Sequence, residues 1–256
     1  MKLTFIALLL SGLLTGCSDN TLVEPSPNKV SATQQETIQT SVLPADTVYQ
    51  QPTDLGATTQ EQNARLVQLQ SVNSPSLTQQ RLIALTRLAL FSSNSEQSLE
   101  RLMTITSALE QLSNNTPTDY EVMAAYGSAL SYQSVFMQDD LGRMNLTARK
   151  GMRIMDRAIK KAPANLGARF LRGVSYANMP SFLNRASFSI DDLQLLKQHT
   201  NANPKSHFMA LVNYYLALAY SRNNQIPQAK ALWTTLSNQP YAQWKTLATA
   251  KLKEID

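Results

Sequence analysis

The chain has 256 residues, a formal net charge of +5 and a single cysteine. One cysteine excludes an intramolecular disulfide, so the folded part depends on apolar burial for its stability. Glycine is scarce, whereas Leu, Ala, Gln, Lys and Arg are plentiful, and this composition favours helix. After the N-terminal segment no apolar run approaches the roughly 20 residues of a membrane-spanning helix.

The N-terminal segment is short and apolar, and it ends in the only cysteine of the chain. Lys2 precedes a nearly apolar stretch, residues 3–14, which has the layout of an export signal. Its end, Leu14-Thr15-Gly16-Cys17, resembles the lipobox of bacterial lipoproteins. The resemblance implies a signal peptide over residues 1–16 and acylation of Cys17. An ordinary signal peptide with a stray cysteine nearby is the alternative.

The residue after the cysteine bears on location. In sorting of the enteric type, an aspartate directly after the acylated cysteine holds a lipoprotein at the inner membrane. Here that residue is Ser18, and the aspartate, Asp19, comes one place later. The resemblance therefore implies an outer-membrane lipoprotein that faces the periplasm. Its acyl chains would attach it without a transmembrane helix.

Residues 17–59 carry the lipidated cysteine and a linker that we expect to be disordered. Prolines are scattered there among Ser, Thr, Gln, Asn and Asp, without apolar periodicity, at Pro25, Pro27, Pro44 and Pro52. A linker of this kind holds the folded domain, residues 60–256, away from the membrane.

From residue 60 onward the apolar spacing is helical, and no strand is predicted. Two capping boxes are predicted, Ser76 with Gln79 and Thr118 with Glu121. Asn203 followed by Pro204 predicts a helix start, and Pro240 predicts another. The apolar positions of the expected helices fall within residues 60–72, 77–89, 99–112, 120–130, 148–159, 166–177, 182–199, 208–220, 229–236 and 241–255.

The last pairs of helices have a recurring spacing. Leu216 and Ala217 are followed by Tyr220, Ala229 and Trp233, in a pattern that resembles a tetratricopeptide (TPR) repeat. In that repeat, small residues lie where two helices approach closely and the large ones fill the space between pairs.

A second match has Gly127 in its first helix and Gly151 in its second, about twelve residues further apart than the repeat allows. The excess lengthens the first helix or loops out around residues 139–145. A third, partial match has Gly173 and Tyr176 in place. The resemblance implies an all-α fold of antiparallel helical hairpins, stacked as a short right-handed solenoid. A generic all-helical domain without repeats is the alternative.

Basic residues are dense between residues 143 and 172, with Asp156 almost alone against them. We expect no nucleic-acid partner for an exported protein, so anionic headgroups or an acidic protein surface fit this run better. Alternatively, this run is an ordinary solvent-exposed helix face without a partner.

A second candidate is the turn over residues 178–185, where Arg185 is placed to hold a carboxylate and Phe182 to lie on an apolar ligand. Alternatively, Phe182 packs into the core and Arg185 pairs with Asp191 or Asp192. The predicted partner contacts are Arg149, Arg153, Arg157, Arg169, Arg172, Phe182 and Arg185.

The sequence carries no catalytic signature. His199 and His207 are the only histidines, and neither comes with a nucleophile motif or a cluster of metal ligands. The neighbouring acids Asp139-Asp140 and Asp191-Asp192 read as caps or surface charge. We expect no enzyme activity, no cofactor and no metal.

The function predicted is that of a lipid-anchored scaffold or assembly factor that binds an envelope protein through a TPR-like groove. The alternative is an accessory protein of a transport system that binds a hydrophobic small molecule. Its cavity would then be lined by Met152, Met155, Phe170, Tyr176, Phe182, Phe208 and Tyr215. A peptidoglycan-associated regulator is a third possibility without a direct mark in the sequence.

Overall fold

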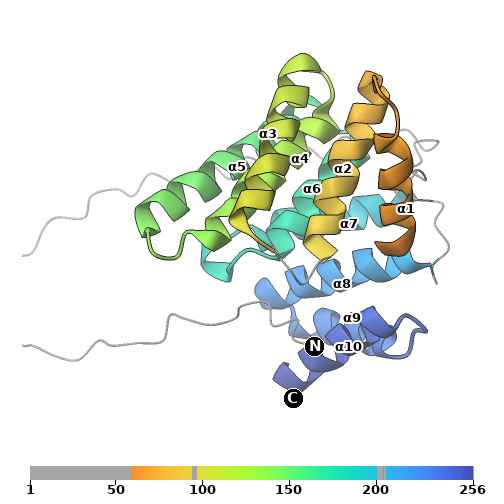
Figure 1. Ribbon diagram of the computed structural model, residues 1–256. Coiled ribbons are helices and arrows are strands. Elements are labelled where there is room, and N and C mark those ends of the chain that lie inside the picture. Colours follow the sequence, from red (N-terminus) through yellow and green to blue (C-terminus); the bar gives the residue numbers. More distant parts are fainter. Residues whose placement is uncertain (1–58, 94–96, 201–203, 205, 256) are drawn as a thin grey trace, which may run out of the picture. The chain divides into compact units, whose positions relative to one another are not determined.

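The computed structural model describes residues 59–93, 97–200, 204 and 206–255. These residues form an all-α structure without strands (Figure 1). The predicted signal peptide, Cys17, the linker up to residue 58 and Asn203 lie outside the described residues. The α-helices are α1 (Thr59–Gln70), α2 (Leu77–Ser93), α3 (Leu99–Asn115), α4 (Tyr120–Gln133), α5 (Leu141–Lys161), α6 (Leu166–Ala177), α7 (Ala186–Gln198), α8 (His207–Arg222), α9 (Ile226–Ser237) and α10 (Ala242–Ile255).

Two short 3-10 helices lie in the connections, η2 (Ser134–Phe136) after α4 and η3 (Ser181–Leu183) after α6. Each α-helix packs against the next one along the chain, and in addition α2, α4, α6, α8 and α10 contact one another in that order. The helical content predicted from the apolar spacing is therefore confirmed. The right-handed, TPR-like stacking remains a prediction.

Apolar side chains from both helices of each pair build the core. One cluster joins α2, α3 and α4 around the fully buried Phe91, Leu102 and Leu109. A larger cluster joins α6 to α10 around Leu193, Leu196 and Trp233. These helices are amphipathic, and burial of their apolar faces is the main favourable contribution to stability.

The helix starts test the predicted caps. Ser76 and Gln79 form the reciprocal pair expected of a capping box: the Ser76 N–H donates to Gln79 Oε1 at 2.8 Å and the Gln79 N–H to Ser76 Oγ at 3.3 Å. The second box is wrong. Asp119 caps α4 by accepting from the Val122 N–H at 3.1 Å, and Glu121 pairs instead with Arg81 of α2.

The largest differences from the prediction concern α5, α7 and α8. The extra residues of the second repeat match lengthen the second helix of the pair, since α4 has 14 residues and α5 has 21. Helix α7 begins at Ala186, so Phe182 lies in η3. Helix α8 begins at His207 with Ser206 as its cap, and Pro204 precedes that cap. The proline cues located these ends only to within a few residues, because a proline marks where a helix cannot continue and leaves the start to the nearest capping side chain.

Helices α4 and α5 touch backbone to backbone at two glycines. A Cβ atom on Gly151 would lie 2.5 Å from the carbonyl oxygen of Gly127 and 2.5 Å from the backbone nitrogen of Ser131. A Cβ on Gly127 would lie 2.8 Å from the carbonyl oxygen of Gly151. Both are positions that the repeat match assigned to a close approach. The glycines thus hold the long helix α5 directly against α4.

The surroundings of the His207 ring lead us to expect that folding stability depends on pH. It stands edge-on to Tyr241, with ring centroids 5.1 Å apart, and lies 5.6 Å from Trp244. Burial lowers the pKa of His207 below its ordinary 6.5, and the nearby Glu61 opposes this shift only in part.

Because the unfolded chain takes up the proton first as the pH falls below about 6.5, folding stability should decrease there. We expect His207→Phe to lose less stability than the wild type between about pH 8 and pH 5 in urea unfolding. An identical loss in both proteins would contradict the assignment. His199, present in both, cancels in the comparison.

Candidate functional site

Helix α5 carries one continuous cationic face. At about 100° per residue, its exposed basic side chains fall within about one third of the helix circumference. Leu146 lies among them. We call this set the α5 face, and it consists of Arg143, Leu146, Arg149, Lys150, Arg153, Arg157, Lys160 and Lys161. All seven basic side chains in the set are exposed.

The first half of α5 is less covered than its second half. No residue between 141 and 150 is buried, although Met144, Thr147 and Ala148 are partly covered, whereas Gly151 and Met152 are buried. Two leucines in the first half are strongly exposed, Leu141 at 60% and Leu146 at 67%. Among the described residues, no ion pair is found for any of the seven cations of the α5 face. The sequence analysis located the cations but missed the two exposed leucines.

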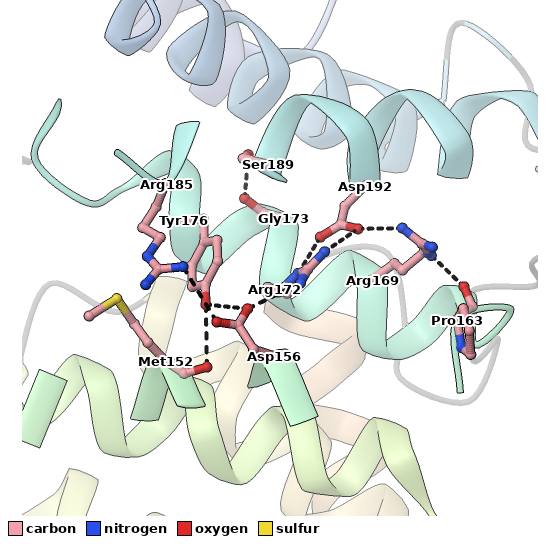
Figure 2. Close-up of polar contacts among 10 residues, drawn as sticks. All are labelled: Met152, Asp156, Pro163, Arg169, Arg172, Gly173, Tyr176, Arg185, Ser189 and Asp192. Atoms are coloured by element: carbon pink, nitrogen blue, oxygen red, sulfur yellow. Dashed lines mark hydrogen bonds and ion pairs between the residues drawn. The ribbon is translucent and has the colours of Figure 1, made fainter. Parts of the chain in front are cut away.

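Helices α6 and α7 are joined by a buried ion cluster (Figure 2). The fully buried Asp192 of α7 accepts from Arg169 Nη1 at 2.8 Å, and from Arg172 Nε at 2.7 Å and Nη2 at 3.0 Å. Arg169 also donates to the carbonyl oxygen of Pro163 at 2.6 Å. The side chains of both arginines are 3% exposed. One carboxylate therefore binds two guanidinium groups away from water.

The cluster continues to α5 through Asp156. Its carboxylate accepts from Arg172 Nη1 at 3.1 Å, from the Tyr176 hydroxyl at 2.7 Å and from Arg185 Nη1 at 3.4 Å. Arg185 also lies over the rings of Tyr176 and Phe188, at 5.5 and 5.6 Å. Burial raises the pKa of the Tyr176 hydroxyl, and the Asp156 carboxylate raises it further, so Tyr176 stays a neutral donor. We call Asp156, Arg169, Arg172, Tyr176, Arg185 and Asp192 the ion cluster.

The ion cluster corrects part of the predicted contact set. Arg169 and Arg172 are interior residues that bind Asp192, so they do not belong to a surface that meets a partner. Arg185 pairs with Asp156, and neither of the two predicted carboxylates, Asp191 and Asp192, is its partner. Asp192 itself, read as a cap or surface charge, is fully buried. The sequence does not distinguish the two neighbouring acids of α7, and the packing of α7 on α6 decides which of them is buried.

Of the predicted contact residues, Arg149, Arg153, Arg157 and Phe182 are exposed. Phe182 lies on η3 and is 74% exposed, so the prediction that it packs into the core is wrong. The turn around it is ordered by backbone hydrogen bonds, from the Leu183 N–H to the Pro180 oxygen at 3.1 Å and from the Asn184 N–H to the Ser181 oxygen at 2.9 Å. Asn184 has φ 52°, which an asparagine tolerates and which reverses the chain into α7. The turn thus presents a large aromatic side chain to solvent.

The residues proposed to line a cavity differ in their burial and in the core cluster to which they belong. Met152, Met155 and Tyr176 are buried together, with Met179 and Phe188 packed against them. Phe170 and Phe208 lie 5.6 Å apart in the larger core cluster. Phe182, by contrast, faces solvent. Most of these side chains therefore pack against each other as core.

Neither a metal-binding cluster nor a membrane-spanning helix is found among the described residues. Within residues 59–93, 97–200, 204 and 206–255, no group of three or more His, Cys, Asp or Glu is placed to hold a metal ion. None of the helices in that part of the chain has the length and apolar content needed to cross a bilayer.

Comparisons with protein-family models, with curated proteins and with solved structures found no match to this chain.

Proposed function

We propose that the protein is a lipid-anchored scaffold of a bacterial cell envelope that holds a partner protein through a TPR-like array of helix pairs. The lipobox-like end at Cys17 supports the anchor, and Ser18 supports the outer-membrane location. The packing of each helix against the next supports the array. The close approach of α4 and α5 at Gly127 and Gly151, and the fully buried Ala217 and Ala229 of α8 and α9, support it as well.

The observation that carries the binding role is the presentation of Phe182. Large aromatic side chains held rigidly are the side chains that contribute most at protein interfaces, because their burial costs little conformational entropy. Phe182 stands on an ordered turn, and the residue that follows the turn, Arg185, is fixed to Asp156 and to two aromatic rings. The ion cluster therefore holds the turn in one position on α5, α6 and α7.

Phe182→Ser should reduce the amount of partner that is recovered with the tethered protein from cross-linked envelopes. Burial of a phenylalanine side chain stabilises by about 1.5–3 kcal/mol, so its loss weakens binding by about tenfold to a hundredfold. Quantitative mass spectrometry of the recovered proteins measures the effect.

Val67→Ser is the matched control, because Val67 is 69% exposed on α1, away from the turn. Equal recovery with the Phe182 variant and the wild type would refute the role of the turn. Equal losses from both variants would show that recovery depends on general surface hydrophobicity.

A further inference from the structure

The α5 face has a charge that the rest of the described fold does not balance. Its seven cations have no acid among them, and Asp156, the only acidic residue of α5, is turned away into the ion cluster. Like charges at helical spacing repel one another, which lowers the stability of an isolated helix. An anionic surface that lies along α5 would remove this repulsion.

The face is extended. From Arg143 to Lys161 an α-helix rises about 27 Å, so the cations form a row longer than one small ligand can occupy. The cations are carried by long, flexible side chains. Such side chains are better suited to a continuous anionic surface than to a binding site with acceptors at fixed positions.

One apolar side chain is placed within this row. Leu146 lies inside the cationic face and is 67% exposed. Leu141, at the start of α5, is also exposed, but helical spacing places it about 140° from Leu146, on the side of Met152 and Ile159. A helix that combines basic side chains with exposed leucines is typical of binding at the boundary between lipid headgroups and acyl chains. Because Met152, Met155 and Ile159 occupy the core side of α5, most of the attraction must come from charge.

We propose that the α5 face lies against the anionic surface of a phospholipid membrane. Leu146 enters the headgroup region, and the cations contact phosphate groups around it. An acidic protein would satisfy the charge equally, but it gives no reason for a strongly exposed leucine inside the cationic face. This binding is separate from the partner contact proposed for Phe182.

Vesicle sedimentation tests the proposal with the chain from Ser18 onward, which lacks the apolar N-terminal segment that would itself enter lipid. We expect binding to vesicles of phosphatidylcholine mixed with phosphatidylglycerol and little binding to phosphatidylcholine alone. Each cation near an anionic surface strengthens binding by about fivefold. The triple variant Arg149→Glu, Arg153→Glu and Arg157→Glu should therefore bind at least about a hundredfold more weakly. In 1 M salt, where the Debye length is about 3 Å, binding should be lost.

The matched control reverses three exposed cations elsewhere, Arg101→Glu, Lys245→Glu and Lys253→Glu, and so has the same net charge as the first variant. It should bind nearly as well as the wild type. Leu146→Ser should bind several-fold more weakly at unchanged charge. Circular dichroism of each variant verifies that it is folded.

Three results would overturn the proposal. The wild type could fail to bind the mixed vesicles, which would leave the face solvated. Both triple variants could lose binding equally, which would indicate attraction by net charge alone. The α5 face could bind polyglutamate while ignoring the vesicles, which would identify an acidic protein as its partner.

Discussion

Asp192→Ala is expected to lower the free energy of unfolding by about 3–5 kcal/mol, because it leaves two guanidinium groups buried without their shared carboxylate. Arg169 and Arg172 are each 2% exposed, so neither can regain water without opening the contact between α6 and α7. Arg172 keeps Asp156 at 3.1 Å, whereas Arg169 keeps only the Pro163 carbonyl oxygen. Since small domains are stable by about 5–15 kcal/mol, the loss should be large in urea unfolding.

Asp191→Ala is the matched control, since it removes the neighbouring, exposed carboxylate. It should change stability by no more than about 0.5 kcal/mol. If Asp192→Ala does not fold, Asp192→Asn keeps the shape and should still be clearly less stable than Asp191→Asn. Equal stability of the Asp191 and Asp192 variants would contradict the importance of the buried pairs.

Apolar residues in place of the ion cluster could give an equally stable or more stable protein. Arg169 Nη2 is buried and has no hydrogen-bond partner among the described residues, so the cluster is incompletely satisfied. Replacing a buried ion cluster by apolar residues of similar volume is often neutral or stabilising. The cluster therefore fixes the position of α7 and the Phe182 turn more clearly than it adds net stability.

Gly151→Ala is expected to destabilise the protein although alanine is the better helix former. Alanine gains about 1 kcal/mol of helix propensity over glycine. The added methyl group, however, would meet backbone atoms of Gly127 and Ser131 at 2.5 Å, and a backbone cannot move aside as a flexible side chain can. Overpacking costs about 1–3 kcal/mol in such cases, and here it should exceed the gain. Thermal unfolding should show a lower midpoint.

Gly142→Ala is the matched control on the same helix, because a Cβ there would meet only Asp140 Oδ1, at 3.5 Å. This variant should be as stable as the wild type or slightly more stable. A stabilised Gly151→Ala would mean that α4 and α5 are not held at backbone contact.

The helices and the glycine crossing could be predicted because their signals are local. The Ser76–Gln79 capping box and the close approach at Gly127 and Gly151 each depend on residues at a fixed spacing, and both are present. The repeat resemblance placed the two glycines at the crossing even though about twelve extra residues separate them.

In the candidate site, the sequence predicted correctly only those exposed residues whose exposure follows from the pattern of charges along one helix. Seven cations on α5 are exposed, as expected for a run of basic residues. Arg169 and Arg172 belong to the same run, but they are buried and form ion pairs with Asp192 of another helix. Glu121 likewise leaves its local capping role to pair with Arg81, about forty positions earlier. Such contacts between distant parts of the chain depend on how helices pack, and spacing within one helix does not reveal them.

That the helical array holds another protein is tested most directly by photo-cross-linking in living cells, with benzoylphenylalanine placed at position 182. Phe182 is the most exposed of the large apolar side chains described, and a similar aromatic probe there preserves its character. We predict a discrete adduct with one envelope protein from position 182 and none from the same probe at position 67. No adduct from position 182, or the same adducts from both positions, would contradict the proposed scaffold.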